Sequence, residues 1–538
     1  MGAAVANAVT NALSLSERYP MLDVSIKDIG SAIGPRTIVD TVSVNPHYGM
    51  ETLRRESSGL VQNCLLPSFY ALAIGSVLQF GIFGKGGMAN FWASEKNINI
   101  LTNAWNSAQG SGEDKVKNYV KNILTPLEGL CGDAAKKEDW KKFATLKEED
   151  FDKVVDNLTK IITTPDLKRK ERKLLFEEAF SKLVDHTKAE EIIKFGEEKI
   201  YNKDVQGFLD KHGDTKLSSN LRTLMRDMND MGSRFIKFGA QEGEHASKFA
   251  SNAIKLLNRK SFIAMPLILA VSFSMQGINR MITKKQSGID GTPIYKDYTD
   301  KRTQKADVKV DKAKLFAEKA FASSLMFLTA WASTGFKGFS KDMFQFKGLT
   351  PTMDQCRWIS AATFSGRMWA SEDKNDLGLS TARDIATFVS FYFLGDYIAK
   401  GFAAAFDKNK EMFNITGHAK KHKNPLVNAF RQTKNWVLNY KLKTFAEAGT
   451  KRAKNIRAFS QIANLGITTL LLGVGIPMFL NKKTDKNRIE DLKKAGISDE
   501  VIKDNYPLSL RGRIQNKAKS VGIYNAFFGS GNSQKYTN

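Results

Sequence analysis

Asp396 and Lys400 are the residues whose types and spacing point most directly to chemistry. A spacing of four places both side chains on one face of a helix. They lie in an otherwise largely apolar stretch, residues 385–406. If this stretch crosses a bilayer, we expect an intramembrane polar pair lining a cavity, because charges at membrane depth are costly and pair with one another. The alternative is an amphipathic helix with both charges in water.

The other chemically suggestive pairs are weaker. His418 and His422 have the spacing of two metal ligands on one helix face, but lysines surround them and no acidic third ligand is near. Ser371 and Lys374 form an SxxK pattern without its usual companion motifs. No phosphate-binding loop, dinucleotide fingerprint or nucleophile elbow occurs. We therefore predict no catalytic residue, no cofactor and no metal, and a non-enzymatic role.

The composition favours anionic partners. The 538 residues carry a formal net charge of +25, which suits phospholipid headgroups, nucleic acid or acidic proteins. A general lysine enrichment of the source genome is the alternative explanation. Three scattered cysteines without a CxxC motif argue against a disulfide framework and for a reducing compartment.

Apolar residues are clustered although the mean hydropathy is only −0.32. A bilayer core of about 30 Å needs about 17–25 apolar residues in a helix. Five apolar stretches occur. The first (60–84), second (261–278) and fifth (462–480) meet that length, the third (320–336) is marginal, and the fourth (385–406) contains Asp396 and Lys400. Buried helices of a large soluble protein would be the alternative. The five predicted membrane segments are residues 60–84, 261–278, 320–336, 385–406 and 462–480.

Cations flank these stretches, as expected for side chains that extend toward the headgroup layer. No cleavable signal peptide is evident in the polar N-terminal lead-in, residues 1–59. The residues predicted to contact anionic lipid are Arg54, Arg55, Lys284, Lys285, Lys420, Lys421, Lys423, Lys451, Arg452, Lys454 and Arg457.

Loop charge gives an orientation that the C-terminus contradicts. Residues 279–319 have 11 Lys or Arg against 6 Asp or Glu, and residues 407–461 have 13 against 3. Five spans would place both on the cytoplasmic side. The basic C-terminal tail, residues 481–538 with 12 against 6, would then lie outside. Either the fifth stretch, with Gly473, Gly475 and Pro477, forms a re-entrant hairpin, or one weak stretch does not cross.

Two further regions have their own character. Residues 113–258 are charged and helically periodic, which predicts an inserted helical domain that offers a surface to protein partners. One predicted apolar face comprises Phe151, Val154, Val155 and Leu158. In the basic region 407–461, Trp436, Tyr440 and Lys443 follow a helical spacing, which predicts an amphipathic helix at the membrane surface or one that covers the core.

The sequence thus predicts an all-α, multi-pass helical membrane protein with an inserted charged helical domain and basic amphipathic helices. By elimination we expect a scaffolding or membrane-organising role. A transporter or channel is the first alternative, although no internal repeat is visible. A peripheral basic protein that binds nucleic acid or anionic lipid is the second. Nucleic acid is the less expected partner because no known binding motif occurs, and the oligomeric state stays open.

Overall fold

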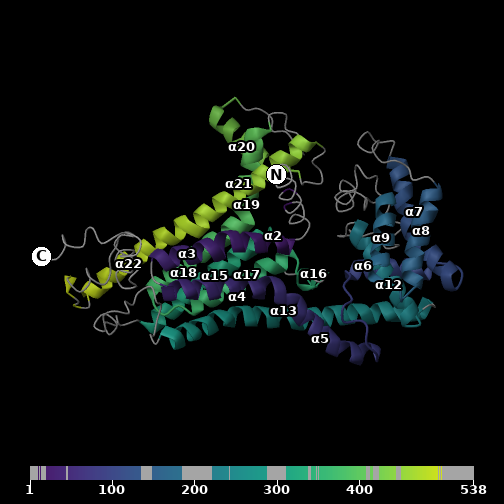
Figure 1. Ribbon diagram of the computed structural model, residues 1–538, viewed down its shortest axis with the longest axis horizontal. Helices are drawn as coiled ribbons and strands as arrows, with labels where there is room; N and C mark the ends of the chain where they lie inside the picture. Colours follow the sequence, from purple (N-terminus) through teal and green to yellow (C-terminus); the bar gives the residue numbers. More distant parts are fainter. Residues whose placement is uncertain are drawn as a thin grey trace, which may run out of the picture. The chain divides into compact units, whose positions relative to one another are not determined.

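The protein is described by a computed structural model, shown in Figure 1. The structure describes residues 20–43, 46–134, 148–183, 221–240, 243–287, 311–336, 341–346, 350–407, 412–415, 423–443 and 450–494, with a few isolated positions. Helices dominate these residues, so the predicted all-α class is confirmed. A short antiparallel ladder joins β1 (Phe413–Ile415) to β2 (Tyr440–Leu442).

The chain forms two compact units. Unit 1 comprises residues 1–67, 265–343 and 351–538, and unit 2 comprises residues 68–264 and 344–350. The boundary falls within α5 (Leu66–Phe83) and within α13 (Gly243–Ser287), so each of these two helices contributes to both units.

Unit 1 is a bundle in which helices distant in sequence lie against one another (Figure 1). Besides its parts of α5 and α13 and the short ladder, its described elements are α2 (Pro20–Lys27), η1 (Asp28–Ile33), α3 (Gly34–Ser43), α4 (Pro46–Leu60), η2 (Val61–Leu65), α15 (Lys312–Ser333), α16 (Lys341–Phe344), α17 (Met353–Trp369), α18 (Lys374–Val389), η4 (Ser390–Leu394), α19 (Gly395–Phe406), α20 (Pro425–Asn439), α21 (Lys451–Thr468), η5 (Thr469–Gly475) and α22 (Ile476–Lys494). α3 contacts α4 and α22, and α18 contacts α15, α17 and α22.

Unit 2 has an apolar core. The predicted face of Phe151, Val154, Val155 and Leu158 is buried there, as predicted from its spacing. Trp105 stacks on Phe235 and meets Tyr119 edge to face at the centre of this core. The helices of unit 2, besides α5 and the first part of α13, are α6 (Glu95–Asn106), α7 (Gly112–Ala134), α8 (Glu148–Thr163), α9 (Arg169–Leu183) and α12 (Leu221–Lys237).

Among the described residues, three helices are long and apolar enough to cross a membrane: residues Tyr48–Phe83, Gly243–Lys285 and Arg452–Asp491. They contain the first, second and fifth predicted stretches. The uncharged part of α15, from Ala320 to its end at Ser333, measures only about 21 Å at the helical rise, and this is shorter than a bilayer core. The fourth stretch lies in a helical backbone that continues without a break from α18 through η4 to α19, residues 374–406, so its length does not exclude it, but it contains Asp396 and Lys400.

The fifth stretch does not turn back on itself. α21, η5 and α22 follow one another without a break in the helical backbone, visible as one long yellow-green helix in Figure 1. The re-entrant hairpin is therefore wrong. Gly473 serves close packing instead, because a Cβ there would lie 2.6 Å from Cβ of Pro35 and 2.7 Å from the carbonyl oxygen of Ser31.

Within the described part of unit 1, four π-helical segments, η1, η2, η4 and η5, interrupt helices. A π-helical turn shifts the backbone hydrogen bonds by one residue, and such turns are frequent at functional sites. Two of them expose carbonyls to side chains: Leu472 in η5 accepts from Arg36, and Gly30 in η1 accepts from Thr469. Carbonyl groups of the π-helical turns therefore accept hydrogen bonds from polar side chains inside unit 1.

Candidate functional site: a buried charge network

The surfaces of the two units differ in polarity. Among the described residues between 84 and 258, Leu174 alone is a large apolar side chain in an exposed position. The helices of unit 1 and the long apolar helices expose many, including Met281 at 63%, Phe321 at 72% and Phe479 at 67%. Large contiguous apolar surfaces mark membrane or protein contact. Ionised side chains are gathered inside unit 1 instead.

Glu56 is the centre of the network. Its Oε1 lies 3.0 Å from a guanidinium nitrogen of Arg36, 3.4 Å from one of Arg367 and 3.5 Å from one of Arg55. Arg367 also pairs with Asp384. These groups come from α3, α4, α17 and α18 and are nearly inaccessible to water. Glu56 therefore holds helices together through three cations.

A second group surrounds Glu51. Arg280 of α13 lies 3.1 Å from Glu51 and 3.1 Å from Asp376 of α18. Arg55 approaches the same Glu51 carboxylate at 4.0 Å. Arg280 thus connects α13 to α4 and α18, and Arg55 connects this group to Glu56.

A third group surrounds Asp40 of α3. Its carboxylate accepts from Arg383 at 3.1 Å, from Thr52 at 2.7 Å and from the amide of Asn481 at 2.9 Å. Arg383 also donates to the hydroxyl of Tyr48 at 3.3 Å. Burial alone would lower the pKa of Arg383, but Asp40, Tyr48 and Glu56 together outweigh it and the pKa is raised. The guanidinium is therefore held in its charged form.

Charges in the network balance among the described residues. Five guanidiniums face five carboxylates, and each cation has its anion within 4.0 Å, as required for ions removed from water. The network residues of α4 precede the first apolar stretch, while Arg280 follows the second and Asn481 follows the fifth. The network therefore extends along the fifth segment from Leu472 to Asn481 and reaches the C-terminal end of the second segment at Arg280, so these two segments run in the same direction.

Asp28, at the start of η1, is an acid beside these ion pairs. Burial, followed by the negative charge of Glu56, raises its pKa to about 7, against the opposing charges of Arg36 and Arg367. A carboxyl group of this kind changes its charge near neutral pH. A perturbed pKa of this origin occurs both in structural ion networks and at functional sites.

A row of polar pairs extends the network between α4 and α13. Arg54 donates to Thr283 at 2.6 Å, and Asn279 donates to Ser58 at 2.8 Å. These two pairs are four residues apart on each helix. Four residues further on, the same spacing places Gln62 opposite residue 275, next to Gln276. Both side chains are almost fully buried, and neither amide has a hydrogen-bond partner among the described residues. Buried amides are usually hydrogen-bonded, to protein or to ordered water.

The predicted intramembrane pair is placed only in part. Lys400 lies on α19 and is 6% exposed. Its ammonium group donates to the carbonyl of Trp436 and lies 4.4 Å from the centre of that indole ring. The side chain of Asp396 lies outside the described residues. The carbonyl and ring of Trp436 therefore provide contacts to this buried ammonium group that water would otherwise provide. The pairing of Lys400 with Asp396 stays a prediction.

The predicted lipid contacts divide by exposure. Lys284, Lys285, Lys423, Arg452 and Lys454 are exposed, whereas Arg457 and Arg54 are half-buried. Arg55 is buried with Glu51 and Glu56, so its charge is used inside the protein and has no surface left for a headgroup. The side chains of Lys420, Lys421 and Lys451 lie outside the described residues.

Few of the other predicted features become a site. Among the described residues, no group of three or more metal-ligating side chains occurs; His418 and His422 lie outside them. Ser371 is buried and donates to the carbonyl of Arg367. Tyr440 begins β2, so the helical face predicted for Trp436, Tyr440 and Lys443 is wrong beyond Asn439, where pairing with β1 ends the helix.

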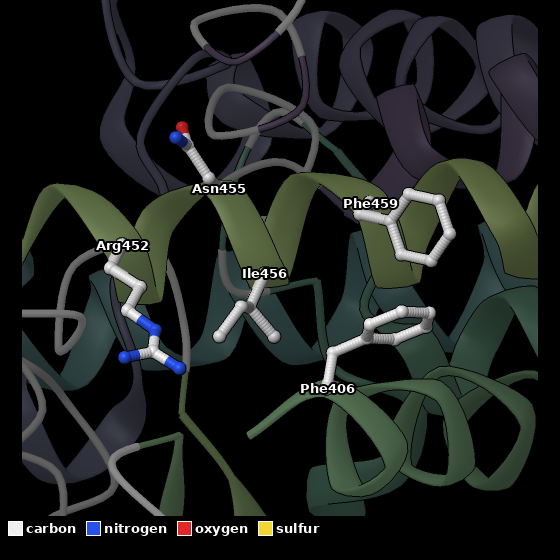
Figure 2. Close-up of a pocket in the computed structure, with 5 residues that line it drawn as sticks. All are labelled: Phe406, Arg452, Asn455, Ile456 and Phe459. Carbon is white, nitrogen blue, oxygen red and sulfur yellow. The ribbon is translucent and has the colours of Figure 1, made fainter. Parts of the chain in front are cut away.

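An open groove of about 490 Å³ lies between the end of α19 and the start of α21, lined by Phe406, Arg452, Asn455, Ile456 and Phe459 (Figure 2). The rings of Phe406 and Phe459 meet edge to face, with centroids 5.0 Å apart. The groove thus combines an apolar floor with one exposed cation.

The network itself was not predicted from the sequence. Its pairs join residues as far apart as Asp40 and Arg383, and single charges on helices carry no sign of such partners. A signal was present in the polar positions Ser272, Gln276, Asn279 and Thr283, whose spacing places them on one face of α13. Comparison with models of protein families, with curated proteins and with solved structures finds no match for this chain.

Proposed function

We propose that this chain is a multi-pass integral membrane protein with a non-enzymatic, membrane-organising role. The observation that carries the proposal is the distribution of polarity in unit 1, where ion-paired charges are buried beside a small apolar core and many large apolar side chains are exposed outside. In water such a surface would favour aggregation, whereas in a bilayer the hydrocarbon covers it. The described part of unit 2 between residues 84 and 258, with its apolar core and Leu174 as its one exposed large apolar side chain, has the polarity of a domain in water.

The interior network supports a structural role. Each of the five guanidiniums has a carboxylate within 4.0 Å, and the groups connect α3, α4, α13, α17 and α18. Helices in lipid gain little from apolar contact with one another, so polar contacts and close packing hold them together. The network therefore fits a fixed helical anchor.

α20 supports contact with a membrane surface. Leu426 and Phe430 are 81% and 70% exposed, and Arg431 and Lys434 are exposed beside them. A helix with an apolar strip flanked by cations is typical of the headgroup boundary of anionic membranes. Together with Lys284 and Lys285, it would attract anionic lipid around the anchor and so organise the bilayer.

Sodium carbonate extraction of membranes tests the integral placement. We expect the full-length protein to stay in the pellet at alkaline pH and to be released only by detergent, because apolar burial in lipid does not depend on charge. A peripheral protein of known behaviour, extracted in parallel, should be released. Recovery of this chain in the carbonate supernatant would reject integral placement and favour the peripheral, nucleic-acid-binding or lipid-binding alternative.

A transporter or channel is a second candidate, and specific observations favour it. Gln62 and Gln276 are buried without satisfied amides among the described residues, and Asp28, in the same unit, titrates near neutral pH. Ionisable and polar groups at membrane depth often mark a pathway. Liposomes containing a pH-sensitive dye separate the candidates: a proton pathway predicts a flux that Asp28→Asn abolishes, whereas a scaffold predicts no flux above that of empty vesicles.

A further inference from the structure

The groove between α19 and α21 has two chemically different parts. Phe406, Ile456 and Phe459 form an apolar floor, and Arg452 stands at one end. Figure 2 shows the side chains of Arg452 and Ile456 pointing to the side of α21 on which Phe406 lies, while Asn455 points away. Arg452 and Ile456 are one turn apart, about 6 Å along the axis. A molecule lying there would meet a cation and then hydrocarbon.

The charge of Arg452 is available to a ligand. The side chain is exposed, and no carboxylate pairs with it in the part of the chain that the structure describes. The nearest acid in sequence to Phe406, Asp407, is 4% exposed and accepts from the backbone amide of Met412 at 2.6 Å. Residues 407–461 carry 13 Lys or Arg against 3 Asp or Glu, so the local field favours an anion.

The apolar floor continues along α21 toward the third candidate span. Phe459 and Ile462 are exposed, followed by Leu470 and Leu471 in η5. These residues belong to the helix Arg452–Asp491, which is long and apolar enough to cross a membrane. An acyl chain that begins beside Ile456 could therefore follow exposed apolar side chains into the hydrocarbon.

We propose that this groove binds one anionic phospholipid, with its phosphate on Arg452 and an acyl chain over Phe406 and Phe459. The proposal rests on the proposed membrane placement. A guanidinium suits a phosphate because it donates two parallel hydrogen bonds. A zwitterionic lipid offers the same chains but carries a compensating cation, so charge complementarity selects the anionic lipid.

Native mass spectrometry of the full-length protein in an uncharged detergent provides the test. The probes are dioleoyl phosphatidylglycerol and dioleoyl phosphatidylcholine at equal concentrations. Arg452→Gln is compared with Lys454→Gln, which removes the same charge two residues further along α21 and therefore on the opposite face of the helix. We expect Arg452→Gln to weaken phosphatidylglycerol binding about fivefold, the equivalent of ~1 kcal/mol, and Lys454→Gln to leave it within twofold.

The apolar floor and the headgroup are tested separately. Phe459→Ala should weaken binding of dioleoyl phosphatidylglycerol more than binding of its dihexanoyl form, and glycerol phosphate should not displace the lipid at equal concentration. Three results would each overturn the proposed lipid site. They are equal effects of Arg452→Gln and Lys454→Gln, equal binding of phosphatidylcholine, and displacement of the lipid by glycerol phosphate. A protein that resists carbonate yet gives any of these results retains the proposed membrane placement and loses only this site.

Discussion

At the scale of single residues, the fold depends on ions that no longer contact water. Glu56 forms ion pairs with three guanidiniums, and the network balances five cations with five anions among the described residues. Removing one partner from a buried pair leaves the others uncompensated, and this costs more than the pair contributes when it is intact. We expect the largest loss of stability at Glu56, the carboxylate with the most guanidinium partners in the network.

Glu56→Gln should therefore lower the free energy of unfolding of unit 1 by about 3 kcal/mol or more. The neutral amide leaves Arg36, Arg55 and Arg367 with reduced compensation. Urea unfolding of the full chain in detergent, followed by tryptophan fluorescence, measures the change. Glu490→Gln, at an exposed position of α22, is the control and should change the value by less than about 0.5 kcal/mol. Equal effects would show that the network does not stabilise unit 1.

A pH-dependent residue lies in unit 2. Burial raises the pKa of Asp227 to about 6, although Arg226 and the amide of Asn97 oppose the shift. The unfolded carboxyl titrates at 3.8, so between pH 4 and 6 the folded state holds the extra proton and stability falls as pH rises. Above pH 6 the full cost of a buried charge is present.

Asp227→Asn removes this cost. We expect the variant to match the wild type near pH 4 and to exceed it at pH 7 by on the order of 2 kcal/mol. Hydrogen exchange of α12 amides in the full chain, measured by mass spectrometry at both pH values, reports the difference locally. A difference that stays constant with pH would contradict the assigned pKa.

At this scale the sequence predicted the type of residue better than its partner. Arg54 and Arg55 look alike in the sequence, as adjacent cations before an apolar stretch, yet only the fold shows that Arg55 turns inward to Glu51 and Glu56. The sequence predicts Asp396 as the partner of Lys400, whereas the neighbours that the structure shows are the carbonyl and ring of Trp436, and the side chain of Asp396 lies outside the described residues. Partners that are distant in sequence leave no local trace in a single chain.

At the scale of elements, the helices of unit 1 approach closely through small residues. A Cβ added at Gly366 of α17 would overlap the carbonyl group of Phe273 of α13, so the two backbones are in contact there. Glycines in helices of membrane proteins commonly permit such approach. Periodicity predicted the buried face of α8, whereas the purpose of each glycine depended on a neighbour that the sequence does not name.

Gly366→Ala should destabilise unit 1 by roughly 1–3 kcal/mol because α17 and α13 must separate. Gly277, on α13, is the matched control, since a Cβ added there would meet nothing within 4 Å. Gly277→Ala should instead stabilise by about 0.5–1 kcal/mol through helix propensity. Thermal unfolding in detergent measures both, and effects of the same sign would show that the close approach is not required.

At the scale of the whole molecule, the sequence predicted five apolar stretches, and three lie in helices long and apolar enough to cross a membrane. The network brings the ends of the second and fifth stretches together, so these two run in the same direction. If both cross a bilayer, the chain between them must return across it an odd number of times. The stretches alone could not show this, because direction depends on partners distant in sequence.

α15 is the candidate for such a return. Phe316, near its start, meets Trp369 at the end of α17, whereas Phe327, further along, stacks on Trp358 near the start of α17. α15 therefore runs antiparallel to α17 and away from the network, where Arg367 lies. Its uncharged part is short because Lys314, Glu318 and Lys319 occupy its first turns. Long lysine side chains can reach the headgroup layer from such positions.

Labelling of introduced cysteines in sealed vesicles tests this return. Thr303→Cys and Ser340→Cys flank α15, and each is made with Cys131→Ser because Cys64 and Cys356 are buried. We expect a membrane-impermeant maleimide to label one position and not the other, and to label both once detergent opens the vesicles. Labelling of both positions, or of neither, in intact vesicles would show that α15 does not cross.

The central claim is that lipid covers the exposed apolar side chains of unit 1. Nitroxide labels on cysteines introduced at Met281 and Phe479, with Leu174 as the control in unit 2, test it in reconstituted bilayers. We expect the first two labels to be relaxed by oxygen and protected from a water-soluble nickel complex, while the third is relaxed by nickel. Relaxation of the labels at Met281 and Phe479 by nickel, to the degree seen at Leu174, would contradict the claim.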